Sequence, residues 1–264
     1  MGKVSGLLLL EDAVKRNYIV PAFNISSIPM AKAVIEGAQK AKAPIFLQTN
    51  MKNLQNFSGK LHPGQQINEL INNYDLPVAI HLDHASDLPI IALAYQNHYS
   101  SFMLDYSEHA LEKNIAKIKH ITQNIDIKKF GLEAELGVVG GKSELFDNQE
   151  IEESLYTDPN EALTFVKKTH IDSLAISIGS KHGLGSSINY KILKEINKKI
   201  DKPLVVHGGS GIEKKDFTKL NNYGVKKINF GTKLHEIFSD GSKNTELADY
   251  VTSLCYNLYA KNKI

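Results

Sequence analysis

Two histidines and an aspartate stand within four positions in the segment His81-Leu82-Asp83-His84. An apolar run at 77–80 precedes them and is typical of a buried strand. Imidazole and carboxylate groups at a strand end could bind a divalent metal ion or exchange protons with a substrate. Taken alone, the segment is more typical of a capped turn that begins the next helix. The choice depends on what the other segments supply.

Polar residues of the same kinds follow most of the other apolar runs. They are histidines, carboxylates, carboxamides and two glycine-rich turns: Asn24, Gln48, Thr49, Asn50, Asp83, His84, Asp105, Glu133, Glu135, His182, Gly183, His207, Gly208, Gly209, Ser210, Gly211, Asn229, Phe230, Gly231 and Thr232. Helix caps alone would not place so many such groups after successive strands. The set therefore favours one shared site.

Eight apolar runs that alternate with amphipathic stretches would position these residues. The runs predict strands at 19–23, 44–48, 77–80, 101–104, 130–136, 173–178, 204–206 and 225–230. Helices are expected at about 27–38, 65–73, 87–96, 108–122, 158–168, 190–199 and 213–221, and again toward the C-terminus. Eight strand–helix units predict an α/β protein, a single (β/α)8 TIM barrel that forms one domain over residues 1–264.

A doubly wound open sheet is the alternative fold, but the first predicted strand lacks the glycine-rich loop that such a sheet uses. In a barrel, the active site forms at the carboxyl ends of the strands. The long irregular segment at about 137–156 follows the fifth strand. A loop of that length in a compact domain predicts an active-site lid.

The composition is that of an ordinary globular protein, with 42% hydrophobic and 23% charged residues and a net charge of +2. No long basic or acidic block points to nucleic acid or to a membrane surface. The leucine run at 7–10 is too short to span a bilayer. The lone cysteine, Cys255, excludes an internal disulfide and fits a reducing compartment, so we expect a cytoplasmic protein.

The residue types gathered at the strand ends indicate a particular chemistry. Three neutral imidazoles, from His84, His182 and His207, suit a divalent metal ion of the zinc type. The turn at 208–211 and the turn at 231–232 each precede a helix, and such turns offer backbone N–H groups to a phosphate. A phosphorylated carbonyl compound would engage both the metal and the phosphate site.

The chain resembles the class II, metal-dependent fructose-bisphosphate and tagatose-bisphosphate aldolases. The motifs that carry the resemblance occur in colinear order over about the first 240 residues, and they are 20–24 (VPAFN), 81–84 (HLDH), 133–137 (EAELG), 156–159 (YTDP), 207–211 (HGGSG) and 227–229 (KIN). Together these motifs are highly specific, although each is modest alone.

The resemblance implies a role for each matching residue. It makes His84, His182 and His207 the ligands of a catalytic Zn²⁺, Asp83 the acid/base group, and Asp105 and Glu135 ligands of a second divalent metal. The residues that match the binding site for dihydroxyacetone phosphate, or that stand at its substrate-contacting positions, are Asn24, Asn50, Gly183, Gly208, Gly209, Ser210, Asn229, Phe230, Gly231 and Thr232. It also implies a monovalent cation (Na⁺ or K⁺), a sugar-phosphate substrate, and a homodimer or homotetramer.

The implied reaction is the reversible cleavage of a ketose (bis)phosphate into dihydroxyacetone phosphate and an aldehyde, through a zinc-stabilised enediolate. Three other readings stay open. One is a zinc-dependent hydrolase on a barrel, which would not explain the phosphate-binding turns beside Asn229. A metal-free aldolase would need a Schiff-base lysine inside the barrel, and Lys226 and Lys227, the nearest candidates, are expected to be solvated or structural. A barrel with weakened catalysis could serve as a metal-binding partner or regulatory subunit.

Several positions depart from the family pattern. Asn50 replaces a usual serine, and Tyr106 and Phe230 are expected to add aromatic bulk at the rim. The lid position of the usual base is Ser143, so Glu144, one place later, is the candidate base. An arginine that would help to hold a second phosphate has no evident counterpart, and Lys261 and Lys263 are weak candidates. Apart from the change of the base, these departures lie on the acceptor side and predict an aldehyde partner other than glyceraldehyde 3-phosphate.

Overall fold

The chain folds into a closed barrel of parallel strands, as the sequence predicts, in a computed structural model that describes residues 2–51, 61–85, 87–124, 130–141, 155–182, 186–239 and 244–264. The barrel strands are β1 (Val20–Asn24), β2 (Ile45–Asn50), β3 (Val78–Ala85), β4 (Ser101–Leu104), β5 (Gly131–Leu136), β7 (Ser173–Ile176), β9 (Leu204–Val206) and β10 (Val225–Phe230). They follow one another in chain order, and β10 closes the barrel against β1.

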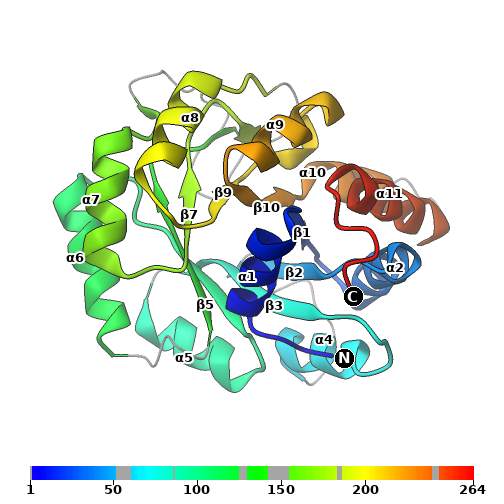
Figure 1. Ribbon diagram of the computed structural model, residues 1–264. Coiled ribbons are helices and arrows are strands. Elements are labelled where there is room, and N and C mark those ends of the chain that lie inside the picture. The colour runs from blue at the N-terminus through cyan, green and yellow to red at the C-terminus, as the bar shows by residue number, and fades with distance from the viewer. Residues whose placement is uncertain are drawn as a thin grey trace.

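Helices surround the barrel (Figure 1). They are α2 (Ile28–Ala41), α4 (Pro63–Ile71), α5 (Leu88–Gln96), α6 (Leu111–Thr122), α7 (Pro159–Thr169), α8 (Tyr190–Lys199), α9 (Phe217–Asn222), α10 (Thr232–Ser239) and α11 (Asn244–Asn257). The predicted helix at 213–221 begins only at Phe217, because two short 3-10 turns, Gly209–Gly211 and Lys214–Asp216, precede it. Within the described residues, no helix is both long and apolar enough to cross a membrane.

A further helix, α1 (Gly6–Arg16), precedes the first strand and was not predicted. Ser5 caps it by accepting a hydrogen bond from the Leu7 amide. The helix lies across one end of the barrel (Figure 1), in contact with β1, β3, β5 and β10. The approach is so close that a Cβ on Gly6 would lie 2.5 Å from the Ser101 Oγ. The leucine run therefore closes the barrel floor.

Strand β3 extends through the His81–His84 segment instead of ending before it. The register against β4 shifts between Leu82 and Ala85, and His84 adopts a left-handed backbone with φ of 61°. This irregularity breaks the alternation of side chains along the strand. Asp83 and His84 can therefore both face the carboxyl end of the barrel.

Two layers of side chains fill the structure. The large outer layer packs between the strands and the helices, and a small apolar cluster of Met103, Ala175 and Val205 lies apart from it. Several buried positions on the strands are polar or charged instead: Gln48, His81, Asp83, Ser101, Glu133, Glu135, Lys227 and Asn229. These residues form the candidate site and the layer directly beneath it.

Candidate active site

Two imidazoles and a carboxylate converge where β3, β5 and β9 end. His84, Glu135 and His207 each offer one atom within 4.8 Å of the others' atoms. The rings of His84 and His207 lie edge to face, with their centroids 5.5 Å apart. Glu135 and His207 are buried, and the side chain of His84 is 17% exposed. The resemblance makes Glu135 a ligand of a second metal, and in the structure its carboxylate lies in the same cluster as the two histidines.

Carboxylates surround His84 on several sides. Its Nδ1 lies 3.2 Å from the Asp83 Oδ1, and its Nε2 lies 3.7 Å from the Asp105 Oδ2. Burial alone would lower the pKa of His84, but Asp83, Asp105 and Glu135 outweigh burial and raise that pKa to about 10. The site therefore favours positive charge at this point.

The surroundings of Glu135 also favour a bound cation. Burial, followed by repulsion from Asp105, raises the pKa of the Glu135 carboxyl well above its usual range. Its Oε1 accepts a hydrogen bond from the Ser107 hydroxyl at 3.3 Å, whereas its buried Oε2 has no hydrogen-bond partner among the described residues. Two imidazoles beside this carboxylate oxygen form a donor set that fits Zn²⁺.

Asp83 is held in place by an amide relay. Its Oδ2 accepts a hydrogen bond from the Asn24 Nδ2 at 2.8 Å, and the Asn24 Oδ1 accepts one from the Gln48 Nε2 at 2.6 Å. Burial opposes ionisation of Asp83, but the neighbouring His84 holds the pKa of this carboxyl well below its usual range. The relay thus orients an ionised carboxylate beside the metal-type donors. Asn24 contacts Asp83 in the structure, in addition to its predicted role toward substrate.

A buried charged layer lies beneath the histidine cluster. The Lys227 ammonium pairs with the Glu133 Oε2 at 2.7 Å, and the other oxygen of Glu133 lies 3.1 Å from the His207 Nε2. Burial opposes ionisation of Glu133, but Lys227 and His207 overcome it and lower the pKa of Glu133 to about 2. Lys227 is fully buried, so it is not solvated. Its neighbour Lys226 is also buried, against Asn17 and Asn221.

The glycine turn after β9 packs so closely against β10 that a side chain at Gly209 would not fit. Gly208 has a left-handed backbone with φ of 73°, which glycine adopts without strain. A Cβ on Gly209 would lie 2.5 Å from the Ile228 Cγ2. The Ser210 Oγ accepts a hydrogen bond from the Lys233 amide at 3.3 Å, which joins this turn to the start of α10. The two predicted phosphate-binding turns are therefore adjacent.

Asn229 lies on β10 next to these turns, and its carboxamide is buried. Neither its Nδ2 nor its Oδ1 has a hydrogen-bond partner among the described residues. A buried amide without partners costs about 1–3 kcal/mol. A polar ligand group at this position would remove that cost, which fits the predicted substrate contact of Asn229.

Of the remaining predicted site residues, the structure describes some and not others. Asn50 ends β2 and is half-buried, and Gly231 and Thr232 lie where β10 passes into α10. The His182 backbone belongs to a small parallel sheet of β6 (Gly140–Gly141) and β8 (Lys181–His182), but the structure does not describe its side chain. Gly183, Ser143 and Glu144 lie outside the described residues, as does most of the predicted lid at about 137–156.

Two expectations about the rim are wrong. The Phe230 side chain is fully buried and packs against Phe23 and Phe217, with centroids 6.0 and 6.3 Å away. Strand alternation turns Asn229 inward and so turns Phe230 outward into the helical layer. Only the Phe230 backbone can therefore contribute at the rim.

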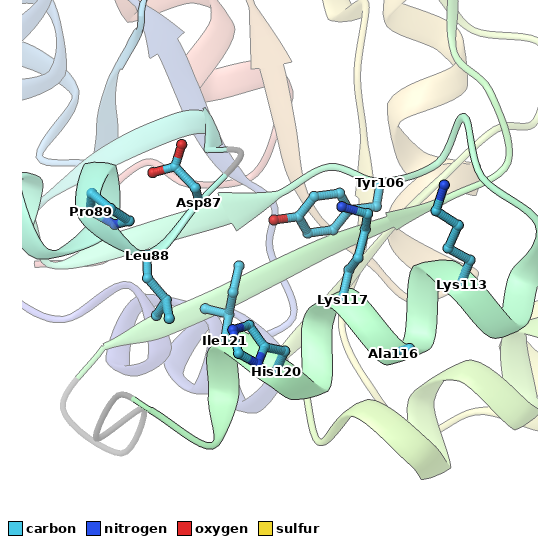
Figure 2. Close-up of a pocket in the computed structure, with 9 residues that line it drawn as sticks. All are labelled: Asp87, Leu88, Pro89, Tyr106, Lys113, Ala116, Lys117, His120 and Ile121. Atoms are coloured by element: carbon cyan, nitrogen blue, oxygen red, sulfur yellow. The ribbon is translucent and has the colours of Figure 1, made fainter.

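The Tyr106 side chain also points away from the rim. It lies between α5 and α6, where the Lys117 ammonium is 4.8 Å from its ring centroid (Figure 2). There it helps to line a cavity of about 500 Å³, together with Asp87, Leu88, Pro89, Lys113, Ala116, Lys117, His120 and Ile121. Neither aromatic ring restricts the acceptor side of the site.

Known proteins share this architecture. The chain matches the family described as fructose-bisphosphate aldolase class-II over residues 4–262, and it belongs to that family. It is 34% identical over 247 residues to a sulfofructosephosphate aldolase of Alkalicoccus urumqiensis, an alignment that covers 92% of this chain and 85% of the relative. It is 33% identical over 244 residues to the D-tagatose-1,6-bisphosphate aldolase subunit GatY of Klebsiella oxytoca, covering 91% and 85%.

A solved structure agrees with these relatives. The crystal structure of the YdjI aldolase from Escherichia coli K12 superposes with a TM-score of 0.83 at 25% identity and covers 98% of each chain. The protein is thus an aldehyde-lyase of the class II aldolase family, with the family's barrel.

Proposed function

We propose that the protein reversibly cleaves a ketose (bis)phosphate into dihydroxyacetone phosphate and an aldehyde. The observation that carries the proposal is the cluster of His84, Glu135 and His207 beside Asp83. The glycine turn and the Asn229 amide, which has no hydrogen-bond partner among the described residues, support a place here for the donor phosphate and hydroxyl groups. Family membership supports the same reaction class.

The metal site is part of the proposal. His84 and His207 would hold the metal together with Glu135, and His182 joins them by resemblance. A zinc ion bound there would supply a Lewis acid that draws electron density from the carbonyl of the ketose. The carboxylates that favour positive charge at His84 support a cation at this point.

Asp83 is the proposed proton carrier. In the cleavage direction its carboxylate takes the proton from the C4 hydroxyl as the C3–C4 bond breaks, and C4 becomes the aldehyde carbon. The electron pair of that bond stays on the three-carbon fragment as an enediolate. In the condensation direction, Asp83 returns its proton to the aldehyde oxygen. The hydrogen bond from Asn24 keeps Asp83 oriented through both steps.

A second acid/base group must handle the C1 proton of dihydroxyacetone phosphate. We assign this role to Glu144 from the resemblance alone. Exchange of that proton with solvent measures the step directly. A zinc-loaded protein that exchanges the proton has a working base, whereas one that binds dihydroxyacetone phosphate without exchange fits the regulatory-subunit alternative.

The aldehyde acceptor is proposed to differ from glyceraldehyde 3-phosphate. Asn50 at the carboxyl end of β2 and the missing arginine support this, whereas the burial of Tyr106 and Phe230 removes them as arguments. The two relatives of nearly equal identity are named for different ketoses, which supports a variable acceptor.

A panel of aldehydes with purified, zinc-loaded protein tests both halves of the proposal. We expect condensation of dihydroxyacetone phosphate with some aldehydes and weak activity on fructose 1,6-bisphosphate. Full activity on fructose 1,6-bisphosphate would contradict the altered acceptor. Failure to bind dihydroxyacetone phosphate would contradict the donor.

Asp83→Ala provides the matched test of the residue roles. Its zinc content should remain near that of the wild type while turnover falls by roughly 10²- to 10⁴-fold, the usual worth of a positioned acid/base group. His84→Ala should lose both zinc and turnover. Wild-type turnover in Asp83→Ala would show that the proton is carried elsewhere.

A further inference from the structure

Lys227 is a fully buried cation inside the barrel, and it takes no direct part in the proposed reaction. Its Nζ lies 2.7 Å from the Glu133 Oε2 and 3.4 Å from the His81 Nε2. All three side chains are buried. A buried ammonium is costly unless it is paired, so its position calls for an explanation beyond packing.

The contacts of Lys227 lead through Glu133 to a candidate metal ligand. The two oxygens of Glu133 are divided, with Oε2 on the Lys227 ammonium and Oε1 at 3.1 Å from the His207 Nε2. A carboxylate can only accept hydrogen bonds, so the His207 Nε2 must carry a proton. The His207 Nδ1 then presents its lone pair on the side where the Glu135 Oε2 lies, 3.8 Å away.

The other side of Lys227 is equally fixed. Because Lys227 donates toward the His81 Nε2, the proton of a neutral His81 lies on Nδ1, which is 2.8 Å from the Ser101 Oγ. The Ser101 hydroxyl in turn donates to the Gly131 carbonyl at 3.0 Å. Ser101, His81, Lys227, Glu133 and His207 thus form one connected series of hydrogen bonds, in which Lys227 donates to both Glu133 and His81.

We propose that Lys227 is a positioning residue for the metal site. Through Glu133 it fixes His207 as the tautomer with Nε2 protonated, so that Nδ1 faces the metal. The inference rests on the proposed metal-dependent function. Carboxylates that hydrogen-bond a metal-binding histidine orient its ring, and their loss usually weakens metal binding roughly 10- to 100-fold. Here the lysine would hold the carboxylate that holds the histidine.

The adjacent residue on β10 offers a matched control. Lys226 is also buried, but within the described residues its ammonium donates hydrogen bonds to neutral acceptors, the Asn17 Oδ1 at 2.9 Å and the Asn221 O and Oδ1 at 3.2 and 2.6 Å. Lys226→Met therefore removes a buried lysine from the same strand without touching Glu133.

The experiment compares Lys227→Met, Glu133→Gln/Lys227→Met and Lys226→Met with the wild type. Zinc affinity is measured by competition with a chromophoric chelator, and folding by circular dichroism. The double variant removes both buried charges, so it remains informative if Glu133 without its partner prevents folding of Lys227→Met. We expect roughly 10- to 100-fold weaker zinc binding in every folded variant that lacks Lys227, and wild-type affinity in Lys226→Met.

The tautomer of His207 is read separately in the metal-free proteins from ¹⁵N chemical shifts. We expect Nε2 to be protonated in the wild type, and a mixture of tautomers in the variants without Lys227. Wild-type zinc affinity and an unchanged tautomer in the double variant would overturn the inference. An equal loss of zinc affinity in Lys226→Met would also overturn it, because the effect would then come from β10 as a whole.

The two proposals fail in different ways. A wild-type protein that binds no zinc contradicts the proposed function, while the tautomer measurement still tests the link from Lys227 to His207. Zinc-dependent turnover that is insensitive to Lys227 contradicts only the positioning role.

Discussion

His81 should make the folded protein sensitive to mild acid. Its imidazole is fully buried, and burial followed by the Lys227 ammonium lowers the pKa of His81 from 6.5 to about 3. Between these values the unfolded chain binds a proton that the folded chain does not bind. The free energy of unfolding must therefore fall as the pH drops below 6.5, and the loss is complete near pH 3.

The size of the effect follows from the shift. Each pH unit inside the window costs about 1.4 kcal/mol, so acidification from 6.5 to about pH 5 removes about 2 kcal/mol through His81 alone. The perturbation is His81→Gln, which keeps polar atoms near Ser101 but cannot titrate. The assay is urea denaturation of both metal-free proteins between about pH 8 and pH 5, with a chelator present.

The readout is the pH slope and not the absolute stability. Removal of an imidazole that contacts Ser101 and Lys227 will lower the stability at every pH. The stability difference between wild type and His81→Gln should nevertheless shrink by about 2 kcal/mol on going from 6.5 to about pH 5. Parallel pH profiles for the two proteins over that range would refute the reasoning.

Three further expectations concern other parts of the barrel. Gly209→Ala places a Cβ 2.5 Å from the Ile228 Cγ2, so the turn proposed to bind phosphate must shift. Steady-state kinetics should then give a KM for dihydroxyacetone phosphate raised at least about tenfold, equivalent to about 1.4 kcal/mol. Gly37→Ala brings a Cβ within 2.3 Å of the Ala248 carbonyl oxygen and should cost about 1–3 kcal/mol in urea denaturation, with zinc affinity unchanged. Burial raises the pKa of the Cys255 thiol to about 12, so a thiol-reactive disulfide should label the protein only after unfolding.

The barrel itself could be predicted because its strands are short apolar runs between amphipathic helices. The prediction was incomplete where strand residues are polar. Strand β3 continues through His81 to Ala85, although these residues do not read as a buried strand. The interior of this barrel end is polar, so hydrophobicity underestimates the strand. Helix α1, in contrast, could have been predicted from the sequence, because Ser5 is a recognisable N-cap and Leu9, Leu10 and Ala13 have helical spacing.

The candidate site was predictable as a set of residues at strand ends, but not in its orientations. Parity along β10 could have shown that Phe230 points away from the site once Asn229 points inward. The partners of Lys227 could not have been found in this way. Glu133 and His81 lie 94 and 146 residues away in sequence, so only the closed barrel brings them into contact. No local pattern marks a lysine that is paired inside a core.

The three clustered donors also tie the stability of the barrel to its surroundings. His84, Glu135 and His207 come from β3, β5 and the end of β9, and the cluster forms only when the intervening strands are in place. A cation that binds this cluster and not the unfolded chain would add about 2.7 kcal/mol of stability at a free concentration one hundred times its dissociation constant. A destabilising mutation far from the site would then leave the protein folded while the metal is abundant, and the same mutation would unfold it in a metal-depleted medium.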